Sequence, residues 1–235
     1  MHLVAELRVI KKMSQNFDIN VWLECFRVKL VSLFGRRLRF FGLQGSYGRG
    51  EQTAGSDIDV VVVIDGMSRR DIFAYRNMLD TMDRSSMICG FVAGSEELCG
   101  WEKSDLLQLF LDTQPIIGSL DSFGVFFTKE DIRRAVKIGA CNIYHACLHN
   151  FLHARNKGVL AELFKSARFT VRMKHYYDTG DYVASFSRLK DVVPDEDRQI
   201  LLCAASVADG CNSDCFDGYS LMLADWAGDI IRTMH

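Results

Sequence analysis

The chain has 235 residues, of which 49% are hydrophobic and 25% are charged, with 2 Pro and 18 Gly. This composition excludes a disordered, collagen-like or low-complexity protein, and the length allows one large domain or two small ones. The 28 Lys and Arg nearly balance the 30 Asp and Glu, giving a net charge of -2. Long nucleic acid and anionic membrane surfaces are therefore disfavoured as partners.

Cysteine usage and the N-terminus indicate where the protein works. The 8 Cys are scattered along a mid-sized chain, so we expect thiols in a reducing compartment rather than a disulfide framework. Met1 to Gln15 carries several charges and contains no apolar core of an export signal. No apolar run approaches the roughly 20 residues of a membrane-spanning helix. The sequence thus predicts a soluble, cytoplasmic protein.

The first half of the chain predicts a mixed α/β unit. Apolar residues at helical spacing predict an amphipathic helix over Ile19 to Phe34, capped by Asn16 or Asp18 and lying against a sheet. A further helix is predicted over 69–84, and the segment 103–112 gives no clear prediction. Apolar and alternating runs predict four strands, at Leu38 to Leu43, Asp57 to Ile64, Met87 to Ala93 and Pro115 to Leu120.

The second half predicts only helices. Thr128 with Glu130 and Asp131 is a typical helix start, with acids in the first turn. Helical patterns then cover 129–154, 158–178, 181–191, 195–208 and 217–233. The expected fold class is therefore α+β, with a small mixed-sheet domain at residues 1–125 followed by an all-helical bundle domain at residues 126–235.

One motif carries the chemistry. The strand ending at Leu43 and Gln44 leads into a glycine turn, Gly45–Gly50, and ten residues after Ser46 a second strand opens with Asp57 and Asp59. Alternation along a strand turns both carboxylates to one face, where they can converge on a divalent metal. The glycines let the backbone approach a ligand closely, which leaves amide groups and the Ser46 hydroxyl for phosphate oxygens. Arg49 adds a positive charge to the same turn.

This pattern resembles the nucleotidyltransferase superfamily of the DNA polymerase β fold, whose signature is Gly-Ser, ten residues, then Asp-x-Asp. The four defining positions are present as Gly45, Ser46, Asp57 and Asp59. The resemblance implies that Asp57 and Asp59 are catalytic and hold two Mg²⁺ ions, and that Gly45, Ser46 and Arg49 bind the nucleotide. It also implies transfer of a nucleoside monophosphate from a nucleoside triphosphate, with ATP as the expected donor, to a hydroxyl group, with release of pyrophosphate.

The chain departs from the family pattern at the third carboxylate, which the next strand usually supplies. Met87 to Ala93 contains no acid, whereas Glu96 and Glu97 follow it and Asp112 lies further on. Spacing alone does not choose among these stand-ins. A weak or inactive nucleotide-binding module, similar to an antitoxin, is therefore an alternative to an active enzyme.

The helical half resembles the C-terminal domain of kanamycin-type nucleotidyltransferases, in which an acid on the first long helix acts as the base. Here that helix carries His145, His149 and His153 on one face, and His145 lies closest to the expected position of the catalytic base. Arg168 and His175 enclose six residues, as in the signature of HEPN ribonucleases, although the basic segment around them favours a solvated face.

The kanamycin-type resemblance also bears on the acceptor and the assembly. It implies a small hydroxylated acceptor, such as an aminoglycoside-like molecule, and a homodimer. Nucleotidylation of a Tyr or Ser on another protein is a further alternative, and neither the acceptor nor the preferred base of the nucleotide follows from the sequence.

Overall fold

The protein is described from a computed structural model, which places residues 17–208 and 213–234. The expectations for residues 1–15 and for Cys211 fall outside these ranges. Within them, the chain divides into two compact units. The first unit runs up to Trp101 and resumes over Asp112–Val125, and the second consists of Glu102–Leu111 and the chain from Phe126 onward.

A mixed four-stranded sheet forms the centre of the first unit, with strand order β3-β2-β1-β4. Strand β1 runs antiparallel to β2 and β4, whereas β2 and β3 are parallel. The bounds of the strands are β1 Leu38–Gln44, β2 Ile58–Ile64, β3 Ile88–Gly94 and β4 Gln114–Ile117. All four predicted strands are confirmed, and the last ends earlier than expected because Gly118 adopts a left-handed backbone with φ +72°.

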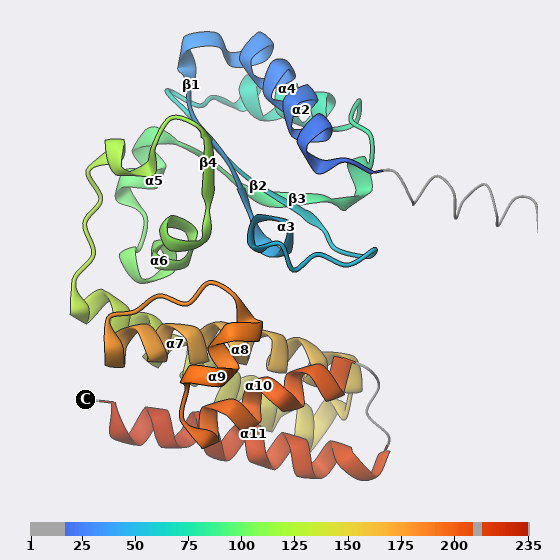
Figure 1. Cartoon of the computed structure of the whole chain (residues 1–235), viewed down its shortest axis with the longest axis vertical. Helices are drawn as coiled ribbons and strands as arrows, with labels where there is room; N and C mark the ends of the chain where they lie inside the picture. The colour runs from blue at the N-terminus through green and yellow to red at the C-terminus, as the bar shows by residue number, and fades with distance from the viewer. Residues whose placement is uncertain (1–16, 209–212, 235) are drawn as a thin grey trace, which may run out of the picture. The chain divides into compact units, whose positions relative to one another are not determined.

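Helices α2 (Ile19–Phe34) and α4 (Arg69–Leu79) cover one face of the sheet (Figure 1). Asp18 caps α2, its side chain accepting from the Asn20 amide at 2.8 Å. Alternate residues of β1 and β2 bury their side chains against these helices, as strand periodicity requires. This core includes Trp22, Phe26, Leu30, Phe41, Leu43, Ile58, Val60, Val62, Tyr75 and Met78. The predicted amphipathic helix is confirmed with both of its ends.

Helix α4 ends five residues before its predicted end at 84. The Thr81 hydroxyl donates to the Met78 carbonyl at 2.7 Å, which satisfies that carbonyl without a further helical turn. Arg84 then adopts a left-handed backbone with φ +55°, which is incompatible with a continuing helix. Among the described residues of the first unit, short 3-10 turns connect the elements at Gly35–Arg37, Ser85–Met87 and Leu120–Phe123.

Helix α6 (Lys103–Asp112) occupies the segment that has no clear prediction from the sequence, and a short helix, α5 (Ser95–Gly100), precedes it. Residues 102–111 belong to the second unit, although they precede the sequence boundary expected near residue 125. The physical reason is burial, because Leu107 and Leu111 pack into the hydrophobic core of the helical unit.

The helical unit otherwise follows the predicted order, and the expected fold class is confirmed. Helix α8 packs against α7 and α10, and α11 packs against α7 (Figure 1). The bounds are α7 Lys129–His149, continued by a π-helical turn at Asn150–Ala154, α8 Lys157–Thr179, α9 Phe186–Val192, α10 Asp195–Ala208 and α11 Ser213–Thr233. A helix was predicted to begin at residue 181, but residues 181–185 are not helical. Gly180 ends α8 with φ +75°, and Ser185 caps α9.

None of the described helices has the length and apolar character needed to cross a bilayer. The cysteines within the described residues are free thiols, as expected from their spacing.

Candidate nucleotide site and helical cavity

The glycine turn forms a short helix, α3 (Gly45–Arg49), directly after β1. The sequence predicted an open turn here. Gly45 adopts φ +70° and Gly50 adopts φ +71°, which are backbone conformations that favour glycine. The chain can therefore leave β1, make one helical turn and leave it again within six residues.

Asp59 lies directly against this turn. It pairs with Gln44 across the β1–β2 ladder, so it is beside Gly45 in space. A Cβ added to Gly45 would overlap the Asp59 carboxylate, with Oδ2 as its nearest atom. Ile58 is fully buried under α2 and α4, so strand alternation turns Asp59 to the opposite face of the sheet. The glycine turn and the Asp-x-Asp strand, which are separated in the sequence, are therefore in contact in the structure.

The other motif residues have different surroundings. Asp57 is exposed just before β2, and Ser46 is half-buried in α3 with its carbonyl accepting from the Glu51 amide at 2.9 Å. Arg49 forms ion pairs with Asp112, at 2.6 Å, and with Glu51, at 3.2 Å. The sequence identified Arg49 but gave no indication that Asp112 is its partner.

The strand register decides among the proposed stand-ins for a third acid. Cys89 of β3 pairs with Asp59 of β2, so the residue beside Asp59 on the next strand is a thiol and not an acid. Glu96 and Glu97 follow Gly94, which pairs with Ile64. Five residues of strand separate that end of the sheet from Asp59, a distance of about 16 Å, so neither glutamate can supply a ligand there.

Asp112 does lie at the same end of the sheet as the motif, because β4 begins at Gln114 and Gln114 pairs with Leu43. Its carboxylate is engaged by Arg49. Over the described part of the chain, no group of three or more His, Cys, Asp or Glu is arranged to hold a metal ion. The two motif aspartates are therefore not joined by a third protein ligand.

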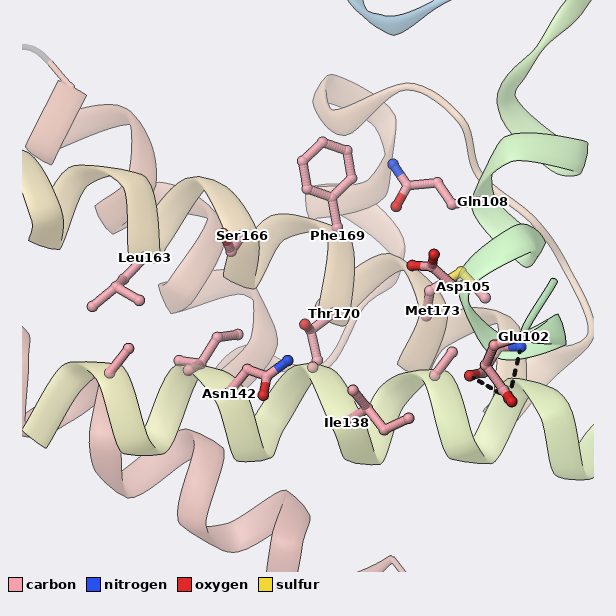
Figure 2. A pocket seen from close by; sticks show the side chains of 15 residues that line it. Glu102, Asp105, Gln108, Ile138, Asn142, Leu163, Ser166, Phe169, Thr170 and Met173 are labelled. Carbon is pink, nitrogen blue, oxygen red and sulfur yellow. Dashed lines mark hydrogen bonds between the residues drawn. The ribbon is translucent and has the colours of Figure 1, made fainter. Parts of the chain in front are cut away.

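A cavity of about 670 Å³ opens within the second unit, between α6, α7 and α8. Figure 2 shows Gln108 and Asp105 on the α6 side, Asn142 on α7, and Phe169 and Thr170 on α8. Amides, a hydroxyl, a carboxylate and an aromatic ring therefore line the same cavity, which suits a polar molecule with hydroxyl groups. The sequence did not identify this cavity, because its residues come from three separate segments.

Glu102 also lines the cavity but is already paired. Its carboxylate accepts from the Ser104 hydroxyl at 3.0 Å and lies 3.0 Å from the Arg134 guanidinium. The hydrogen bonds from Ser104, together with Arg134, hold the pKa of Glu102 below its ordinary value. Glu102 is therefore a weaker base than an ordinary carboxylate.

The three predicted histidines lie on the surface at the end of α7 and in the following π-helical turn. All three are exposed, with ring centroids 6.4 Å apart for His145 and His149 and 5.0 Å apart for His149 and His153. Asn142 and Ala146 line the cavity on either side of His145 in the sequence, but His145 is not among the lining residues.

The pair that suggested a HEPN signature is part of the helical packing. Arg168 lies over the Phe186 ring at 3.9 Å, and His175 is buried. Between them Arg172 is fully buried, stacked on Phe186 at 4.0 Å and donating to the Tyr182 hydroxyl at 3.0 Å. This cluster is the α8–α9 interface and gives no sign of a ribonuclease site.

Comparison with known proteins assigns a class to the part of the chain that holds the sheet and the motif. The family model described as a nucleotidyltransferase domain matches residues 23–134. Residues 23–134 are a nucleotidyltransferase domain. This segment therefore belongs to the nucleotidyltransferase class, whose general reaction is the transfer of a nucleoside monophosphate.

Solved structures extend the similarity over the nucleotidyltransferase domain and the helices together. The spectinomycin adenyltransferase AAD(9) from Enterococcus faecialis, solved with ATP and spectinomycin, matches with a TM-score of 0.60 and 14% identity. The match covers 90% of this chain and 98% of that one, and at this identity it shows a shared fold. A toxin–antitoxin structure with AMP-PNP has a TM-score of 0.31 and 18% identity, covering 41% of this chain and 74% of that one. No curated protein matches in sequence.

Proposed function

We propose that the protein transfers a nucleoside monophosphate from Mg-ATP to a hydroxyl group of a small polar acceptor and releases pyrophosphate. The observation that carries the proposal is the contact between Asp59 and Gly45. It brings a metal-binding type of side chain against a turn suited to phosphate, on the face of the sheet opposite α2 and α4. The fold shared with an adenyltransferase solved with ATP and a small-molecule acceptor supports the same conclusion.

The residues at this site fit magnesium. Asp57 and Asp59 offer carboxylate oxygens, which are the ligands that Mg²⁺ prefers, and the space beside Gly45 is filled by a carboxylate where other residues would carry a Cβ. Magnesium bound there would neutralise charge on the phosphates and stabilise the attacking and leaving oxygens. Two carboxylates leave most of its coordination positions to water and to the nucleotide, which is the usual arrangement for this ion.

The glycine turn would hold the triphosphate. The Gly45 and Ser46 amides and the Ser46 hydroxyl are donors of the kind that bind phosphate oxygens, and Arg49 supplies positive charge. Fixing the β and γ phosphates keeps the α phosphorus in line with the acceptor oxygen. In the reaction the acceptor oxygen bonds to the α phosphorus, the bond from that phosphorus to the bridging oxygen breaks, and pyrophosphate leaves with the electron pair.

The acceptor must also lose a proton. We propose that the helical cavity binds the acceptor through Gln108, Asn142 and Thr170, with Phe169 covering an apolar face. His145 is the proposed base, since a neutral imidazole accepts a proton near neutral pH. Asp105 is the competing candidate because it lines the cavity itself.

Incubation with α-labelled ATP and magnesium tests the proposal. We expect label on a small molecule from a panel of aminocyclitols and other polyols, and no label with the Asp57→Asn, Asp59→Asn double variant. Label on a protein instead would favour protein nucleotidylation. If Mg-ATP raises the unfolding temperature but no acceptor is labelled, the chain is a nucleotide-binding module, and an active double variant would refute the metal assignment.

We further propose that the protein is a homodimer in the cytoplasm, on the basis of the kanamycin-type resemblance and the free thiols. Light scattering of the purified chain should give twice the monomer mass of 26.7 kDa. A monomer at micromolar concentration would contradict the dimer.

A further inference from the structure

Arg49, the last residue of α3, is held by a carboxylate from a distant part of the sequence. Its Nη1 lies 2.6 Å from Oδ2 of Asp112, 63 residues away. The Arg49 side chain is 10% exposed and the Asp112 side chain is 0% exposed. An ion pair this enclosed is poorly screened, so it fixes the guanidinium far better than a surface pair would.

The same segment holds α3 at a second point. The side-chain amide of Gln114 donates to the Gly48 carbonyl, and Gln114 pairs with Leu43 in the sheet. Gly48 packs so closely on the Leu43 carbonyl that an added Cβ would lie 3.1 Å from its oxygen. Residues 112–114 therefore anchor the far end of the short helix whose first residues are Gly45 and Ser46.

We propose that Asp112 is a positioning residue of the nucleotide site, which orients Arg49 and with it the glycine turn for the triphosphate. The inference rests on the proposed function, which puts the triphosphate on that turn. A fully buried carboxylate near a polyphosphate is electrostatically unfavourable by itself, since like charges repel. The ion pair with Arg49 compensates for this repulsion.

The two possible roles of Asp112 predict opposite changes in the affinity for Mg-ATP when Asp112 is replaced by Asn. If Asp112 acted only as a negative charge near the site, Asp112→Asn would tighten the binding of Mg-ATP. If it positions Arg49, the same change weakens binding, by about tenfold in Kd, because a charge-assisted hydrogen bond is lost. We also expect KM for ATP to rise more than kcat falls, since Asp112 does not touch the reacting atoms.

Titration calorimetry of the full chain with Mg-ATP measures this difference. Glu51→Gln is the matched control, because Glu51 contacts the same guanidinium at 3.2 Å but its side chain is 22% exposed. We expect that change to alter Kd by less than about threefold, as for a partly solvated ion pair. A Kd for folded Asp112→Asn that is unchanged or tighter than wild type would overturn the inference.

A double-mutant cycle with Arg49→Gln separates positioning from a general loss of structure. Because Asp112 acts through Arg49, adding Asp112→Asn to Arg49→Gln should not weaken binding further. The double variant removes both buried charges, so it should fold even where a single variant does not. Further weakening in the double variant would overturn the inference, and a wild-type chain that does not bind Mg-ATP would refute the proposed function as well.

Discussion

At the scale of single residues, Gly45 shows why the motif begins with glycine. Its φ of +70° is unfavourable for other residues, and the Asp59 carboxylate occupies the place of a Cβ. Gly50 has almost the same backbone angle, φ +71°, but an added Cβ there would meet nothing within 4 Å. A substitution at Gly50 therefore introduces backbone strain alone, whereas one at Gly45 introduces the same strain and a clash with the Asp59 carboxylate.

We predict that Gly45→Ala abolishes the stabilisation by Mg-ATP, because the methyl group must displace Asp59. Gly50→Ala should destabilise the fold by about 1 kcal/mol through its backbone angle and leave nucleotide binding intact. Thermal unfolding with and without Mg-ATP measures both effects. Equal losses of binding in the two variants would show that strain, rather than the contact with Asp59, decides the outcome.

The identity of the base gives a second prediction at this scale. If His145 takes the acceptor proton, His145→Gln lowers kcat at least tenfold, because the group that accepts the proton is lost. Asp105→Asn should then change mainly KM for the acceptor. The kcat and KM of the labelling reaction distinguish the two, and an unchanged kcat in His145→Gln with a kcat at least tenfold lower in Asp105→Asn would transfer the role to Asp105.

Residues that act locally could be found in the sequence, and those that act through distant contacts could not. Gly45, Ser46, Asp57 and Asp59 form a fixed spacing across one turn, so their pattern identifies them. The pairing of Arg49 with Asp112 depends on how β4 lies beside β1, which no local pattern encodes. The same holds for Cys89, whose position opposite Asp59 follows from the register of β3.

At the scale of elements, a capping box starts α4 and links it to the turn before β1. The Ser68 hydroxyl caps Asp71, and the Asp71 carboxylate accepts from the Ser68 amide at 2.8 Å and from Arg37 at 2.5 Å. The bond from the Arg37 guanidinium, with those from Ser68, holds the pKa of Asp71 well below its ordinary range. Capping side chains of this kind mark helix starts, and the first residues of α4 and α2 could be predicted closely.

We predict that Ser68→Ala lowers the free energy of unfolding by about 1 kcal/mol at neutral pH. Asp71→Asn should also destabilise, with an effect that depends on pH. Because the folded pKa is depressed, the contribution of Asp71 is present above about pH 4 and is lost as pH falls below it. Urea unfolding across this range tests the sign, and a cost of Asp71→Asn that grows in acid would contradict it.

Helix α6 was not predicted because its residues 106, 107 and 109–111 are almost continuously apolar. Such a run does not distinguish a buried helix from a strand. A turn was predicted at Gly45–Gly50, where the structure has a short helix. The glycines indicate that the chain changes direction, but they do not specify the backbone conformation of the turn.

At the scale of the whole molecule, the helical unit depends on one buried carboxylate that joins three helices. Asp197 at the start of α10 accepts from Lys174 of α8 at 2.7 Å and from the Trp226 indole of α11 at 2.8 Å. Its side chain is 3% exposed. Loss of this charge would leave a half-buried ammonium without its principal partner.

Asp197→Asn should therefore destabilise the unit by about 3 kcal/mol. Asp178→Asn is the matched control, because Asp178 lies 3.5 Å from the same ammonium but is 48% exposed, and we expect a change close to zero. Chemical unfolding followed by tryptophan fluorescence, to which Trp226 contributes with Trp22 and Trp101, measures both changes. Equal effects of the two substitutions would contradict the role of Asp197.

Residues 102–111 precede β4, the last strand of the first unit, in the sequence but belong to the second unit. During synthesis, α6 leaves the ribosome before α7 and α8, which form the rest of its surroundings. Leu107 therefore cannot be buried in the helical core until those helices have been synthesised. Strand β4 of the first unit follows α6 directly in the chain. The nascent chain cannot complete its units one after the other, as separate domains usually do. A fragment that stops at Val125 would therefore expose Leu107 and Leu111, the residues of α6 that pack into the helical core.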